Sequence, residues 1–82
     1  MDLLSKMKVG TFAEITFIEN SPIYSKLLEM GFLIGTKVEL VFKAPLGDPI
    51  AVEVNGTVFS LRKDEASYIQ VKQLLSENLI KE

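Results

Sequence analysis

Apolar and polar residues alternate in several short runs of this chain, which is the pattern of half-buried β-strands. The first two runs cover residues 12–19 and 37–43. In both, we expect every second residue to face the core. The apolar residues that alternate in this way are Ala13, Ile15, Phe17, Val38, Leu40 and Phe42.

Further along the chain, residues 50–54 and 57–62 form a pair of strand-like runs separated by Asn55-Gly56. Asn-Gly is a strong hairpin signal, because both central positions of the favoured two-residue turn need a positive φ. Residues 63–67 are polar and predict a turn or a single helical turn, and a last short strand is expected over 68–72. Residues 3–8 are mixed and predict a turn that leads into the first strand.

One helix is predicted between the first two strands. Ser21 is a candidate N-cap residue, and Pro22 suits the first helical position. Gly31 follows where a left-handed residue ends a helix. The expected apolar stripe is formed by Ile23, Leu27 and Met30.

These elements predict a mainly β fold, with about five strands and one short inserted α-helix. Closure into a small SH3-like β-barrel is the simplest architecture, because it removes the exposed edges of an open sheet. We expect one domain over 1–82, with its core in about 3–72. Residues 73–82 are expected to form a short C-terminal helix or a frayed tail.

Composition restricts the chemistry that the 82 residues offer. The absence of Cys and His excludes disulfides, zinc fingers, thiol nucleophiles and serine–histidine catalysis. Nine basic and eleven acidic residues argue against nucleic-acid binding driven by net charge. No glycine-rich phosphate-binding loop precedes a Lys-Ser or Lys-Thr pair, so we expect no GTP binding. An acid–base pair such as Asp48 with Glu65 is conceivable, but nothing in the sequence places the two in a pocket, so we expect no enzymatic activity.

The longest apolar stretches are far shorter than a membrane span, and we expect no direct insertion into a membrane. The N-terminal residues carry an acid, Asp2, and no apolar signal core. A cytoplasmic location is therefore predicted, with any recruitment to a membrane occurring through a partner.

Two blocks of sequence, in a fixed order and spacing, form the most specific motifs of the chain. The first block is LLEMGF at 27–32, followed by GTKV at 35–38. The second block begins with APLGDP at 44–49 and continues through Val54, Gly56, Leu61, Arg62, Glu65, Ala66, Ile69 and Val71. Together these blocks resemble the FeoA family of small ferrous iron transport A proteins, and the resemblance extends over about residues 3 to 72.

The resemblance implies an SH3-like β-barrel with a helical insertion. It also implies an accessory role, in which the protein contacts the cytoplasmic, GTP-binding part of a ferrous iron permease. The residues that we expect at this contact are Phe32, Pro45, Leu46 and Asp48. The alternative for the 44–49 loop is a rigid connection in which Asp48 bonds to nearby backbone. The alternative for Phe32 is a place in the core beside the helix cap.

Metal binding has little support from the residues. Only carboxylates and carbonyls are available as ligands, and Asp64-Glu65 is the candidate for weak divalent binding. We therefore predict no cofactor and no resident metal site. Two other functions remain open: a direct iron-binding sensor or carrier, and a free-standing relative of the barrel domain of metal-dependent repressors. The expected oligomeric state is a monomer or a weak dimer, with self-contact through strand edges or residues 73–82.

Overall fold

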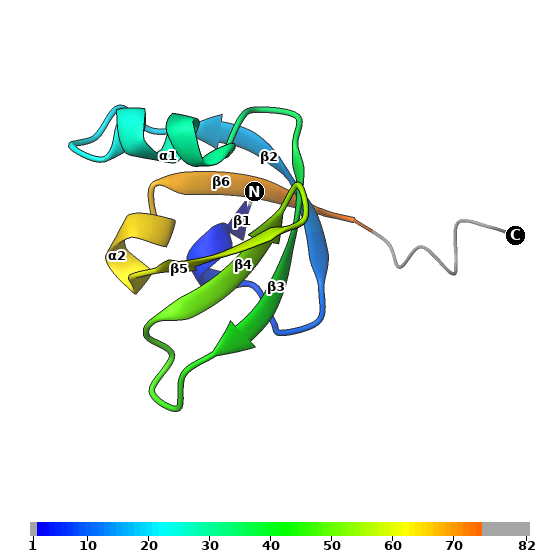
Figure 1. The fold of residues 1–82 in the computed structure, drawn as a ribbon. Coiled ribbons are helices and arrows are strands. Elements are labelled where there is room, and N and C mark those ends of the chain that lie inside the picture. Colours follow the sequence, from blue (N-terminus) through cyan, green and yellow to red (C-terminus); the bar gives the residue numbers. More distant parts are fainter. Residues whose placement is uncertain (1, 75–82) are drawn as a thin grey trace, which may run out of the picture.

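A computed structural model describes residues 2–74 of the chain (Figure 1). One antiparallel sheet of six strands runs in the order β1-β6-β2-β3-β4-β5. The strands are β1 (Asp2–Leu3), β2 (Phe12–Ile18), β3 (Lys37–Lys43), β4 (Ile50–Val54), β5 (Thr57–Leu61) and β6 (Ile69–Leu74). The helices are the short 3₁₀ helix η1 (Leu4–Lys6), α1 (Tyr24–Met30) and α2 (Lys63–Ala66). The predicted mainly β class with one inserted helix is confirmed.

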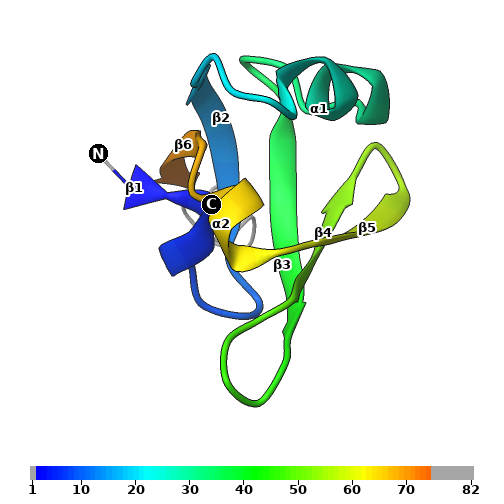
Figure 2. The same cartoon turned by 90° about the vertical axis from the view of Figure 1, so that its left-hand side faces the viewer.

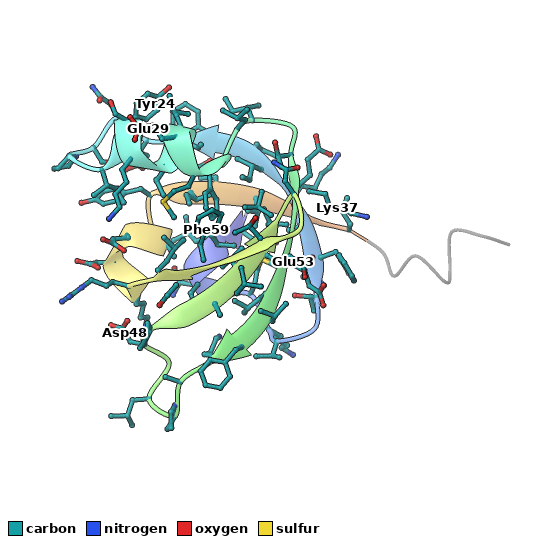
Figure 3. All side chains as sticks on the ribbon, in the orientation of Figure 1. Tyr24, Glu29, Lys37, Asp48, Glu53 and Phe59 are labelled. Carbon is teal, nitrogen blue, oxygen red and sulfur yellow. The ribbon has the colours of Figure 1, made fainter. Side chains whose placement is uncertain are left out.

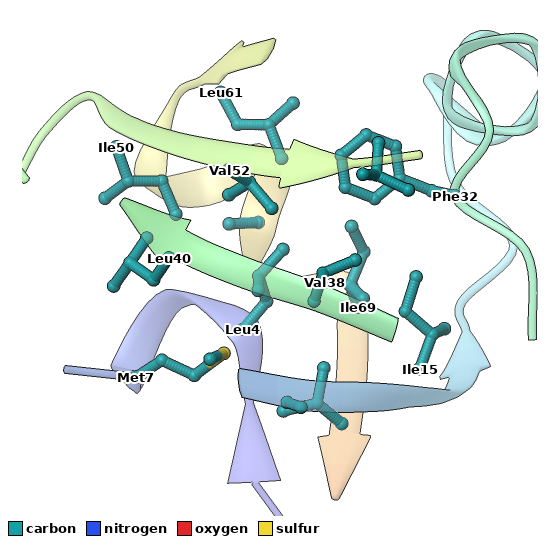
Figure 4. Packing of buried hydrophobic residues seen from close by; sticks show 14 of the residues in the cluster. Leu4, Met7, Ile15, Phe32, Val38, Leu40, Ile50, Val52, Leu61 and Ile69 are labelled. Carbon is teal, nitrogen blue, oxygen red and sulfur yellow. The ribbon is translucent and has the colours of Figure 1, made fainter. Parts of the chain in front are cut away.

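The sheet curls around a single apolar core (Figure 4). Its largest fully buried side chains are Phe32, Leu4, Ile15, Leu27, Leu40, Ile50, Ile69, Val38, Val52, Val54 and Val71. Between the two edge strands, η1 packs against α2, so helical turns rather than strand pairing close the gap. Among residues 2–74, β1 and β5 do not pair with each other, and the expectation that closure removes the sheet edges is wrong.

A bulge in β2 overturns one side-chain prediction. Ile15 pairs with Val71 and Phe17 pairs with Gln70, so Thr16 is an extra residue in its strand. An extra residue shifts the two-residue alternation of side chains. Phe17 is consequently 48% exposed, whereas Ile18 is 6% exposed and belongs to the core. The inward orientation expected for Phe17 is wrong.

β3 contains a second bulge. Leu40 pairs with Val52 and Phe42 pairs with Ala51, which leaves Val41 as the extra residue. Phe42 is 55% exposed instead of facing the core. Upstream of the bulge, the alternation predicted the buried positions correctly.

The sequence predicted the C-terminal end of α1 correctly but not its N-terminal end. The helix begins at Tyr24, whose N–H donates to the backbone oxygen of Ser21 at 3.1 Å. Within the described residues 2–74, the Ser21 hydroxyl has no hydrogen-bond partner. The predicted Ser21 cap is wrong, because a turn separates it from the helix. Gly31 ends the helix as predicted, with φ of 100°. The N–H groups of Gly31 and Phe32 donate to carbonyls of the last helical turn, in the manner of a Schellman motif.

The later elements follow the prediction closely. Asn55 and Gly56 both have positive φ, at 52° and 83°, and join β4 to β5 in the expected hairpin. The polar segment at 63–67 contains the single turn of α2. The turn expected at 3–8 includes η1, while the short β1 was not anticipated. A helix or tail was expected over 73–82, but Gln73 and Leu74 belong to β6, so the expectation is wrong for these two residues. The rest of that segment lies outside the described residues.

Candidate functional site

The β3–β4 loop, residues 44–49, projects from one end of the molecule (Figure 1). The N–H of Gly47 donates to the Ala44 carbonyl at 2.7 Å, and the N–H of Ala44 donates to the Pro49 carbonyl at 3.0 Å. Pro45 occupies the second turn position, where its fixed φ is favourable. The turn leaves the Leu46 side chain 94% exposed. A well-defined backbone therefore presents an apolar side chain to solvent.

Asp48 connects this loop to α2 (Figure 3). Its Oδ1 accepts a hydrogen bond from the backbone N–H of Lys63 at 2.9 Å. Glu65 accepts from the N–H of Arg62, also at 2.9 Å, so two carboxylates cap the start of the helix. The peptide bond between Asp48 and Pro49 is cis. Asp48 is exposed, but one of its oxygens already has a structural partner.

The base of the loop is held by a second long-range contact. Lys43 Nζ donates to the Met7 carbonyl at 2.7 Å, which ties the end of β3 to the segment before β2. Phe42 lies directly before this anchor and is exposed by the bulge described above. Sequence reasoning missed Phe42 as a surface residue, and no local signal marks the bulge. We call Phe42, Pro45 and Leu46 the loop surface.

Phe32 does not belong to this surface. Its side chain is fully buried, and its ring lies 5.9 Å from the ring of Phe59 between centroids. It follows α1, which lies at the opposite end of the molecule from the loop (Figures 1 and 2). The structure thus brings Pro45, Leu46 and Asp48 together and removes Phe32 from the predicted contact, because its ring fills the core.

Two further features bear on the chemistry of the chain. In the range 2–74, no three Asp, Glu, His or Cys side chains come close enough together to hold a metal ion. Over the same residues, no helix has the length and apolar character needed to cross a membrane.

Comparison with known proteins identifies the family of this chain. A family model described as the FeoA domain matches residues 3–73. The chain belongs to the FeoA family. This FeoA chain is also 37% identical, over 76 residues, to a Porphyromonas gingivalis protein described as a fusion of Fe(2+) transport protein A with the Fe(2+) transporter FeoB. The match covers 92% of this chain but only 9% of that relative.

Solved structures share the fold of this FeoA chain. A FeoA-like protein from Clostridium acetobutylicum is 34% identical, with a TM-score of 0.83 and coverage of 92% of this chain and 88% of the other. The zinc-complexed FeoA of Stenotrophomonas maltophilia, described as a prokaryotic SH3 domain protein, is 34% identical. Its TM-score is 0.79, and the match covers 88% of this chain and 91% of that one. The SH3-like fold class is thereby confirmed.

Proposed function

We propose that this chain is a non-enzymatic accessory protein of ferrous iron uptake, which contacts the cytoplasmic, GTP-binding part of a ferrous iron transporter. The observation that carries the proposal is the Porphyromonas gingivalis relative, in which a similar region and the transporter FeoB are one polypeptide. Covalent linkage keeps two parts at a high effective concentration. As separate chains, the same two parts need an interface with its own affinity. On this proposal the protein acts at the cytoplasmic face of the membrane.

The loop surface is the proposed contact. Leu46 offers an apolar side chain that is 94% exposed, and Phe42, at 55%, adds an aromatic ring before the loop. Exposed apolar side chains gathered at one place are typical of protein–protein contacts. The backbone bonds within the loop and the Asp48–Lys63 bond fix its shape before binding. A preformed loop loses little conformational entropy when it docks.

The test is an amide-shift NMR titration with the isolated cytoplasmic domain of a FeoB-type transporter, with and without GTP. We expect shifts centred on 42–48 for the wild-type chain. Leu46→Asp is expected to weaken binding at least about tenfold, because a carboxylate then has to be desolvated at the contact. Ile34→Asp is the matched control, since Ile34 is 65% exposed and lies between α1 and β3. The helix α1 is at the end of the molecule opposite to the loop (Figure 1).

The outcomes distinguish the proposed contact with the transporter from the proposal that this contact is the loop surface. Loss of binding for Leu46→Asp alone supports both proposals. Equal binding by both variants overturns the loop surface and keeps the transporter as partner. If the wild-type chain does not bind the domain, the accessory role through this contact is refuted.

Direct metal binding is a second candidate function, favoured by the zinc complex of the Stenotrophomonas maltophilia relative. Anaerobic calorimetry of this chain with Fe(II) and with Zn(II) tests it. A site of micromolar or tighter affinity for Fe(II) supports a sensor or carrier. Heat signals no larger than those of buffer reject this candidate.

A further inference from the structure

β5 is an edge strand that keeps unused hydrogen-bonding capacity. The sheet order ends at β5, and among residues 2–74 no strand pairs with its outer side. Figure 2 shows the hairpin of β4 and β5 at the margin of the molecule, with the other end of β5 leading into α2. Val58 and Ser60 of β5 are both exposed, so the outer side of β5 is available for another strand.

The hairpin register identifies which backbone groups face outward. Asn55-Gly56 is a two-residue turn, so Val54 and Thr57, which flank it, form a hydrogen-bonded pair. Pairing then alternates along β5, and Phe59 and Leu61 also bond to β4. The N–H and C=O groups of Val58 and Ser60 therefore point away from the sheet. Between residues 2 and 74, neither has a backbone partner in a turn or loop.

This edge also lacks the features that protect most edge strands. Natural edges carry charged side chains, proline or bulges that prevent pairing with another chain. The sequence of β5, TVFSL, contains no charge and no proline, and its pairing with β4 has no bulge. Val58 is 55% exposed, so an apolar side chain accompanies the open backbone groups.

We propose that β5 pairs antiparallel with β5 of a second copy of this chain, about a two-fold axis at Phe59. In this register Val58 lies opposite Ser60 of the second copy, and Ser60 lies opposite Val58. Both are hydrogen-bonded pairs, so together they use the outward N–H and C=O groups of all four residues. The two Phe59 residues form the non-hydrogen-bonded pair on the axis.

The charges beside β5 favour this occupant. Glu53 of β4 lies opposite Val58, and Arg62 continues the outer-face alternation of Val58 and Ser60. The two-fold axis places Arg62 of the second copy opposite Gly56, which is diagonal to Val58. Glu53 lies on the other side of Val58, in β4. The arrangement occurs twice by symmetry and brings opposite charges together. The Arg62 N–H already donates to Glu65, which ends the ladder and keeps the interface short.

Sedimentation velocity from micromolar to millimolar concentration tests the proposal. The wild-type chain is expected to rise from its 9.2 kDa monomer mass toward twice that value. Ser60→Pro removes an N–H that points outward, so it spares the bonds between β4 and β5. We expect it to weaken dimerisation at least about tenfold, because each dimer loses two backbone hydrogen bonds. Ser60→Ala keeps the N–H and is expected to dimerise like the wild type.

A second variant guards against a folding defect caused by proline. Val58→Lys adds a charge of the kind that natural edges use, and should also abolish the dimer. Two-dimensional NMR spectra check that each variant stays folded. In a mixed-labelled sample, we expect an NOE between the Hα atoms of the two Phe59 residues.

A wild-type chain that stays monomeric at all concentrations overturns the proposal. This outcome also covers a β5 that pairs only with a strand of another protein. A dimer that survives both edge variants overturns the assignment to β5.

Discussion

At the scale of single residues, Asp48 illustrates how one side chain serves the fold within a candidate contact. Its carboxylate reaches across the sequence to the N–H of Lys63 and fixes the loop against α2. The sequence suggested that Asp48 bonds to backbone near in sequence, whereas the observed partner lies fifteen residues away. Phe32 shows the reverse case, because a residue assigned to a contact surface proves to be a core side chain.

Asp48→Ala is expected to lower the free energy of unfolding by about 1 kcal/mol, because a helix start loses its capping acceptor. Urea denaturation followed by circular dichroism measures the change. Asp48→Asn is the matched control: it removes the charge but keeps a carbonyl oxygen that can accept from Lys63. A loss for Asp48→Asn as large as that for Asp48→Ala would show that charge, rather than the hydrogen bond, is responsible.

At the scale of elements, the two bulges decide which aromatic rings the molecule presents. β2 and β3 both keep their alternation until one extra residue shifts it. Phe17 and Phe42 then lie on the surface, although each has the sequence context of a core position. The bulge in β3 thereby supplies an aromatic ring to the loop surface.

Replacement of Phe42 tests the bulge directly. Phe42→Ser is expected to change the free energy of unfolding by less than about 1 kcal/mol, since the ring is largely solvated. Phe32→Leu is the comparison in the core and should cost about 1–3 kcal/mol, because it leaves unfilled volume beside Phe59. Thermal and urea unfolding of both variants give the values. A greater loss for Phe42→Ser than for Phe32→Leu would contradict the register of β3.

At the scale of the whole molecule, closure depends on two short helical turns. Leu4 of η1 is fully buried, and Ala66 of α2 is fully buried as well. The contact between η1 and α2 closes the core between edge strands that do not pair. Among residues 2–74, no strand pairs with the outer side of β5, and its residues Val58 and Ser60 are exposed. The proposed second copy binds there.

Leu4→Ala is therefore expected to destabilise the whole fold, by about 2–5 kcal/mol, because it opens a cavity where the sheet edges meet. Val9→Ala is the control, since Val9 is apolar but 54% exposed. Equilibrium urea unfolding measures both changes. Similar small losses for the two variants would show that η1 does not close the core.

Local signals predicted the elements that carry their own stereochemical requirement. Asn55-Gly56 predicted the hairpin because both turn residues need positive φ, and Gly31 predicted the end of α1 for the same reason. Ser21 is a residue type that caps helices, but it lies three residues before the helix start at Tyr24. A turn closed by the hydrogen bond from the Tyr24 N–H to the Ser21 carbonyl precedes the helix, which starts at Tyr24.

The sequence by itself determined the mainly β class, the inserted helix, most of the core and the FeoA family, because these follow from periodicity, turn chemistry and motif order. Only the tertiary structure decided the two bulges, the burial of Phe32, the bond from Asp48 to Lys63 and the open edge of β5. The physical reason is shared by all of these features. Each depends on strand register and on contacts between distant segments, which are set by packing of the whole core and leave no mark in the local pattern.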